Sequence, residues 1–106
     1  MPDKFGIKPE YLSIIIQAFR DEETIQQAIL FGSRAIGNFK NGSDIDIALK
    51  GERLTQEKIT RLSYKLNEET PLPYKFDLLN YHTANNAYLL KEIDDKGIEI
   101  YSKIIN

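Results

Sequence analysis

Hydrophobic residues recur along the chain with two spacings, one typical of helices and the other typical of strands. Near the start, four of them follow the helical spacing i, i+3, i+4, i+7: Leu12, Ile15, Ile16 and Phe19. This stripe predicts a helix over residues 9–20 that packs one side against the core, and Pro9 suits its first turn. We expect residues 1–8, a mostly polar segment, to form a loose arm.

Four other segments have the pattern of strands. Residues 25–31 are largely apolar, although periodicity alone leaves open whether residues 28–31 form a strand or a buried helix. Residues 43–50, 74–81 and 98–101 alternate between apolar and polar side chains, which places one set of side chains on each face of a sheet. The residues expected to face the core in the second and third of these four strands are Ile45, Ile47, Leu49, Phe76 and Leu78.

Two further helices are predicted between the strands. Thr55 is expected to cap a helix over residues 55–69, which the prolines after it prevent from continuing. Thr83 is expected to cap a last helix over residues 83–95, and Gly97 suits the end of that helix. Helices and strands therefore alternate, which favours helices packed on a sheet. Alternation alone would suggest parallel βαβ units.

Composition and charge narrow the class of protein. A chain of 106 residues with 42% hydrophobic and 28% charged residues is expected to be one globular domain over residues 1–106. The net charge of −2 argues against stable binding of nucleic acid through a large basic surface. There is no cysteine and one histidine, His82, so neither a disulfide nor a Cys/His metal site is expected. No apolar stretch approaches the ~20 residues of a membrane span and the start does not have the pattern of a signal peptide, so we expect a soluble cytoplasmic protein.

Two carboxylates share one face of a predicted strand. Asp44 and Asp46 are separated by one residue, so both project away from the core, together with Ala48. Carboxylates this close repel each other unless a divalent cation lies between them, and Mg²⁺ is commonly held by one or two carboxylates plus substrate phosphates. Gly32 and Ser33 directly follow the first predicted strand. They suit phosphate binding, because glycine lets the backbone come close and main-chain N–H groups at a helix N-terminus point at an anion.

These features belong to one continuous run. Residues 32–48 read GSRAIGNFKNGSDIDIA, which resembles the signature of the nucleotidyltransferases related to DNA polymerase β: Gly-Ser, a short spacer, then Asp-x-Asp. In so short a chain, the run is similar more narrowly to the minimal nucleotidyltransferases, the MntA-like partners of HEPN proteins. Asp77, in the strand-like run 74–79, matches the third carboxylate of the family. The resemblance implies a short helix over residues 34–37 and an α/β (α+β) nucleotidyltransferase fold, a small mixed sheet with helices mainly on one face.

The resemblance implies a catalytic role for three carboxylates. Asp44 and Asp46 would bridge two Mg²⁺ ions, which clamp the attacking and leaving oxygens of the transfer. Asp77 would complete the metal site and accept the proton of the attacking hydroxyl. We therefore expect replacement of Asp44 or Asp46 by alanine to abolish transfer without unfolding the chain.

The same resemblance implies the residues that bind the nucleotide. Gly32 and Ser33 would hold the β- and γ-phosphates of a nucleoside triphosphate. Arg34 would neutralise phosphate charge, with Lys40 and Lys75 as weaker candidates. ATP is the implied donor, although nothing in these residues distinguishes adenine from other bases.

A chain of this length has room for a nucleotide site but not for a separate substrate domain, so the resemblance implies a second protein. MntA-like proteins neutralise HEPN ribonuclease toxins by transferring AMP to a toxin tyrosine. The chain is accordingly expected to be an antitoxin with protein adenylyltransferase activity, paired with a HEPN-type toxin or another helical subunit. Two alternatives stay open: transfer to a small molecule whose site lies on a separate subunit, and a non-catalytic module that masks its partner by contact.

Overall fold

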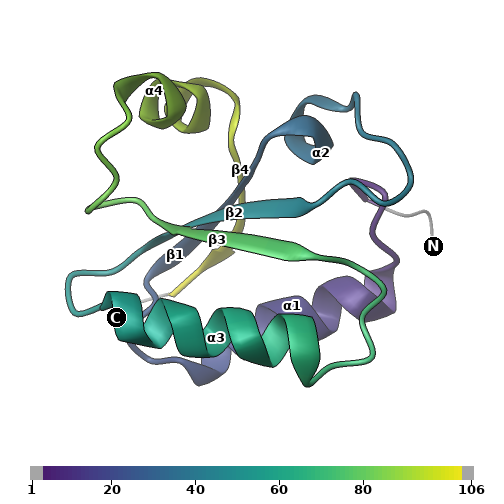
Figure 1. The fold of residues 1–106 in the computed structure, drawn as a ribbon, viewed down its shortest axis with the longest axis horizontal. Coiled ribbons are helices and arrows are strands. Elements are labelled where there is room, and N and C mark those ends of the chain that lie inside the picture. Colours follow the sequence, from purple (N-terminus) through teal and green to yellow (C-terminus); the bar gives the residue numbers. More distant parts are fainter. Residues whose placement is uncertain (1–3, 104–106) are drawn as a thin grey trace.

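The computed structural model describes residues 4–103. Within these residues, eight elements follow one another along the chain (Figure 1): α1 (Pro9–Asp21), β1 (Gln27–Phe31), α2 (Ser33–Ile36), β2 (Ile45–Lys50), α3 (Gln56–Glu68), β3 (Phe76–Asn80), α4 (Ala87–Lys96) and β4 (Ile98–Ser102). The predicted order of helices and strands is confirmed. In this part of the chain, no helix combines the length and the apolar character needed to cross a membrane.

The strands of this region form one mixed sheet in the order β3-β2-β1-β4. β2 and β3 run parallel, whereas β1 is antiparallel to both of its neighbours. α1 and α3 lie on one face of the sheet, and α2 and α4 lie on the other (Figure 1). The mixed sheet is thus confirmed. The two longest helices share one face as expected, while α4 partly covers the other.

Each face of the sheet has its own hydrophobic core. Three residues of β2 are fully buried in the core beneath α1 and α3, as the alternation of this strand predicts: Ile45, Ile47 and Leu49. On the other face, Ala48 is also fully buried and belongs to a smaller core with Ile93 of α4. The prediction that Ala48 faces the site is therefore wrong, because α4 covers this part of the sheet. The part of this face that α4 leaves uncovered lies near the start of β2, at Asp46.

The segment before α1 is an ordered turn over the residues that the structure describes. The N–H of Ile7 donates to the carbonyl of Lys4 at 2.8 Å, and the N–H of Lys4 donates back at 3.1 Å. The side chain of Ile7 is 1% exposed and belongs to the main core. The expected loose arm is therefore wrong for residues 4–8, because this turn buries a large apolar side chain. Residues 1–3 lie outside the described residues.

This burial gives a stability prediction. Ile7→Ala should lower the free energy of unfolding by about 2–5 kcal/mol, since it removes buried methyl groups and leaves a cavity. Ile36→Ala is the matched control, because Ile36 is 46% exposed and exposed positions change stability by about 0.5 kcal/mol or less. Urea denaturation followed by circular dichroism measures both. Equal effects of the two substitutions would contradict the packing of this turn.

The last helix begins later than predicted. Thr83 does not cap it: the side chain of Asn86 accepts the N–H of Leu89 at 3.1 Å and is the N-cap. Upstream, the side chain of Asn80 accepts the N–H of His82 at 3.1 Å, and its backbone carbonyl accepts the N–H of Thr83. These bonds close a turn directly after β3, and the turn delays the helix by four residues.

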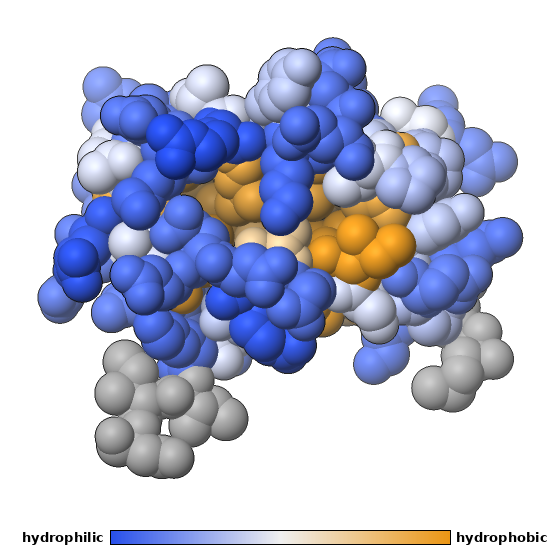
Figure 2. Space-filling model, turned by 90° about the horizontal axis from the view of Figure 1, so that it is seen from below, coloured by the Kyte–Doolittle hydropathy of each residue, from blue (hydrophilic) through white to orange (hydrophobic). Residues whose placement is uncertain are grey.

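The outer surface of α1 and α3 is mainly hydrophilic, with an apolar strip along its middle (Figure 2). A cavity of about 550 Å³ lies between the two helices. Ala18 and Leu62 provide apolar lining, and charged side chains such as Lys58 and Glu22 surround them. This cavity lies on the opposite side of the sheet from Asp46, so it contains none of the predicted site residues.

Candidate active site

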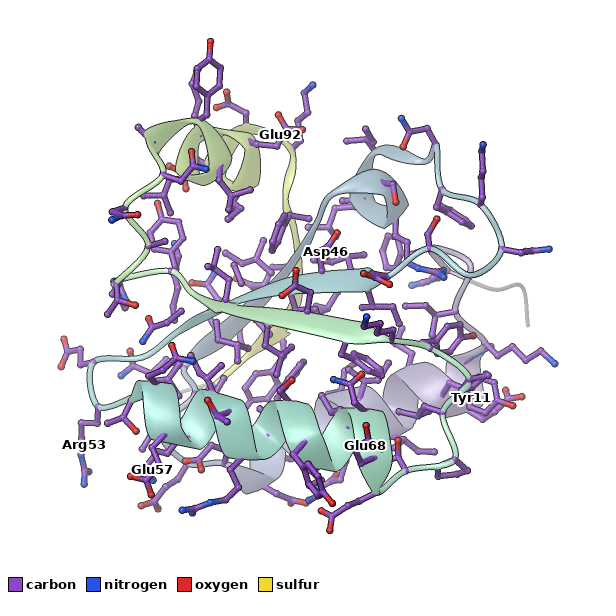
Figure 3. The ribbon with its side chains drawn as sticks, in the orientation of Figure 1. Tyr11, Asp46, Arg53, Glu57, Glu68 and Glu92 are labelled. Carbon is purple, nitrogen blue, oxygen red and sulfur yellow. The ribbon has the colours of Figure 1, made fainter. Side chains whose placement is uncertain are left out.

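Asp46 and Asp77 lie side by side on neighbouring strands. They are direct register partners in the parallel pair of β2 and β3, so both side chains project to the face opposite the main core. Figure 3 shows Asp46 on the side of the sheet that carries α2 and α4. Asp44 is exposed and lies one residue before β2. The structure therefore brings the three predicted carboxylates to one end of the sheet.

The charges of these carboxylates act on one another. Burial raises the pKa of the Asp46 carboxyl above its ordinary value, and the negative charges of Asp77 and Asp44 raise this pKa further. The positive charge of Arg34 opposes these effects. Within residues 4–103, no lysine, arginine or histidine forms an ion pair with any of the three carboxylates. Their repulsion is thus not relieved by an ion pair in this part of the chain.

The three carboxylates have the chemistry of a Mg²⁺ site. Mg²⁺ takes oxygen ligands, and a divalent cation would relieve the repulsion that raises the pKa of Asp46. Among the described residues, no group of three or more Asp, Glu or His side chains is already close enough to hold a metal. The face therefore offers suitable ligands without a preformed cage, and these ligands would have to come closer together to hold a metal.

The turn between β1 and α2 packs directly against Asp46. Gly32 has φ of 75° and ψ of −155°, a conformation that essentially only glycine adopts. A Cβ atom at this position would overlap the Oδ2 atom of Asp46. Ser33 follows as the first residue of α2. The glycine thus lets the predicted phosphate-binding turn and a predicted metal ligand touch.

Arg34 is oriented into the protein interior. Its side chain is 3% exposed, and its guanidinium donates to the carbonyl of Ser43 from Nε at 3.1 Å and from Nη2 at 2.7 Å. Nη1 donates to the carbonyl of Phe5 at 3.0 Å. These bonds use one N–H on each of the three nitrogens and hold the guanidinium in place. The geometry therefore gives Arg34 a positioning role: it ties the N-terminal turn and the segment before β2 to α2.

Tyr81 follows the end of β3, at the opposite end of this strand from Asp77. Its hydroxyl donates to a carboxylate oxygen of Asp94 on α4 at 2.7 Å. The ammonium group of Lys50, at the end of β2, lies 4.1 Å from the centre of the Tyr81 ring. These contacts fix α4 against the ends of β2 and β3.

Lys40 and Lys75, the weaker candidates for phosphate binding, are both exposed.

The raised pKa of Asp46 predicts an effect on stability without metal. A carboxyl whose pKa is higher in the folded state destabilises the fold once pH rises through that pKa. Asp46→Asn should therefore raise the melting temperature at pH 7 in EDTA, and the gain should vanish below about pH 3, where the carboxyl is protonated in both states. Thermal unfolding across this pH range tests it, with Asp21→Asn on α1 as the control. A variant less stable than the parent at pH 7 would contradict the account.

The mixed sheet, the glycine turn and the paired carboxylates together define a nucleotidyltransferase domain. The chain belongs to the family described as Polymerase beta, Nucleotidyltransferase, which matches residues 14–105. No curated protein matches the sequence.

Solved structures with this fold include antitoxins of the MNT type. A toxin-antitoxin structure with AMP-PNP is similar with a TM-score of 0.73 and 28% identity, over 87% of this chain and 73% of that chain. A complex of the MNT antitoxin with the tri-AMPylated HEPN toxin of Shewanella oneidensis has a TM-score of 0.66 and 26% identity, over 87% and 70% of the two chains. A MntA-HepT toxin-antitoxin complex has a TM-score of 0.65 and 26% identity, over the same two shares.

Proposed function

We infer that this chain is a Mg²⁺-dependent adenylyltransferase that transfers AMP from ATP to a tyrosine of a HEPN-type toxin, and so acts as an antitoxin. The observation that carries the proposal is the contact of Gly32 with Asp46, which is itself the register partner of Asp77. Nucleotidyl transfer needs nucleotide phosphates and metal ligands to meet at one point. The contact of Gly32 with Asp46 supports such a site, because it joins the proposed phosphate-binding turn to a proposed metal ligand.

The proposed reaction transfers the adenylyl group of ATP to the tyrosine oxygen. The tyrosine oxygen attacks the α-phosphorus of ATP, a new P–O bond forms, the bond to the β-phosphate oxygen breaks, and pyrophosphate leaves. Mg²⁺ held by Asp44, Asp46 and Asp77 would supply positive charge for the attacking and leaving oxygens. The carboxylate of Asp77 takes the phenolic proton as the bond forms. Backbone N–H groups of Gly32 and Ser33 hold the β- and γ-phosphates.

The similar structures support the choice of donor and acceptor. One of them contains AMP-PNP, an analogue of ATP, and this supports ATP as the donor here. Another contains an AMPylated HEPN toxin bound to its MNT antitoxin, and this supports a protein acceptor.

Labelled ATP tests the proposal directly. The chain and the protein that co-purifies with it are incubated with Mg²⁺ and ATP that carries label on the α-phosphate or, separately, on the γ-phosphate. Adenylyl transfer places the α-label on the partner and leaves the γ-label in pyrophosphate. Label on the partner from the γ-phosphate would show a kinase instead. No label from any nucleoside triphosphate would favour neutralisation by contact, and label on a small molecule would favour the small-molecule alternative.

A further inference from the structure

A second, basic cavity lies beside the carboxylate face. Its volume is about 260 Å³, and it lies between the N-terminal turn, the loop before β2 and the segment before β3. Three cationic side chains line it, those of Lys8, Arg34 and Lys40. No carboxylate is among its described lining residues, and neither Gly32 nor Ser33 belongs to it. The cavity is therefore separate from the proposed nucleotide turn.

The buried guanidinium of Arg34 forms no ion pair with a carboxylate in the part of the chain that the structure describes. Its hydrogen bonds use one N–H on each of Nε, Nη1 and Nη2, and guanidinium has five. One N–H on each terminal nitrogen thus remains. No carboxylate of residues 4–103 lies within 4.0 Å of it. A buried charge is costly unless it is paired, so an anion beside the remaining N–H groups would be stabilised.

The surroundings of Arg34 shape the cavity around that charge. Its Cζ atom lies 5.2 Å from the ring centres of both Phe39 and Tyr74. Gly6 has φ of 72°, and a Cβ atom there would overlap the Phe39 ring and lie 2.8 Å from Nη1 of Arg34. The rings hold the guanidinium in place by cation–π attraction, and the glycine keeps the space beside it clear.

We propose that this cavity binds an oxyanion of the phosphate class. Arginine matches phosphate oxygens with a planar pair of N–H donors, and lysines add point charges at the rim. The occupant is either free phosphate or the phosphate group of a nucleotide. The bound anion would lie next to Arg34. The guanidinium of Arg34 donates to the carbonyl of Ser43, which is the residue directly before Asp44. Anion binding here does not depend on the transfer reaction, so either can fail without the other.

Amide NMR tests the proposal on the whole chain in EDTA. Inorganic phosphate is titrated at constant ionic strength against chloride. Binding should be saturable and should shift the amide signals of Gly6, Asn41 and Gly42, which line the cavity. A parallel titration with AMP separates the two sources: tighter binding at the same amides assigns a nucleotide phosphate, and equal or weaker binding assigns free phosphate.

Charge-removing variants complete the test. Lys8 and Lys40 are exposed, so Lys8→Gln with Lys40→Gln should leave the fold intact and weaken phosphate binding about three- to tenfold. The matched control is Lys91→Gln with Lys96→Gln on α4, which removes the same charge away from the cavity and should leave the affinity unchanged. Shifts that are linear in phosphate, scattered over the surface, or equally reduced by both double variants would overturn the proposal.

Discussion

Asp46→Asn is expected to lower the rate of AMP transfer by about 10³-fold or more while the chain stays folded. Asparagine keeps the size of the side chain and removes the charge that binds the metal. Metal ions contribute several kcal/mol to such transfers, and each 1.36 kcal/mol corresponds to a factor of ten in rate. Asp46 should be the most sensitive of the three carboxylates, because it is the most enclosed and lies against the Gly32 turn. Transfer of α-labelled phosphate to the partner measures the rate.

The control for this loss is Asp21→Asn. It makes the same chemical change on α1, where the carboxylate accepts a hydrogen bond from Gln17 on the far side of the sheet. Its transfer rate should match that of the parent. Circular dichroism of both variants shows that loss of activity is not loss of fold. An Asp46→Asn variant with the activity of the parent would remove this residue from the proposed site.

Gly32→Ala should cost both stability and activity. Any residue other than glycine would lose about 1–3 kcal/mol of stability in the backbone conformation of Gly32. The added Cβ atom would also overlap the carboxylate of Asp46. Either the turn or the carboxylate must move, and a misplacement near 1 Å can cost about 100-fold in rate. We therefore expect a lower melting temperature and a transfer rate reduced by about 100-fold or more. Thermal unfolding and the labelled-ATP assay measure the two effects.

Gly37→Ala separates backbone strain from the overlap with Asp46. Gly37 also has a positive φ, of 87°, but a Cβ atom there would meet nothing within 4 Å. This variant should lose about 1–2 kcal/mol of stability and keep most of its activity. Equal losses of activity in Gly32→Ala and Gly37→Ala would mean that the turn acts only through stability, which would contradict its proposed role at the site.

Much of the sheet can be predicted from local pattern. The alternation around β2 places Ile45 and Ile47 in the core and Asp46 on the opposite face, because side chains alternate along a strand. The pairing of Asp46 with Asp77 depends on the order of strands. The hydrophobic pattern of each segment does not determine the order of the strands in the sheet. The alternation of helices and strands by itself suggested only parallel βαβ units. The family resemblance supplied the mixed sheet.

Local sequence pattern marks neither the contacts of Arg34 nor the start of α4, and each case has a physical reason. Arg34 donates to backbone carbonyls, one of them that of Phe5. Every residue carries a carbonyl, so no side-chain pattern in the sequence indicates which residues accept these hydrogen bonds. The start of α4 depends on a choice between two good capping residues, Thr83 and Asn86. The turn closed by Asn80 decides it, and that turn follows from where β3 ends.

The intact mass of the partner protein, measured before and after incubation with this chain, ATP and Mg²⁺, shows whether AMP is transferred to protein. We expect the partner to gain one or more whole AMP units with the unaltered chain and none with Asp46→Asn. Fragmentation should then place the added mass on a tyrosine. A partner that binds the chain tightly but never changes mass, with ATP or any other nucleoside triphosphate, would contradict the account.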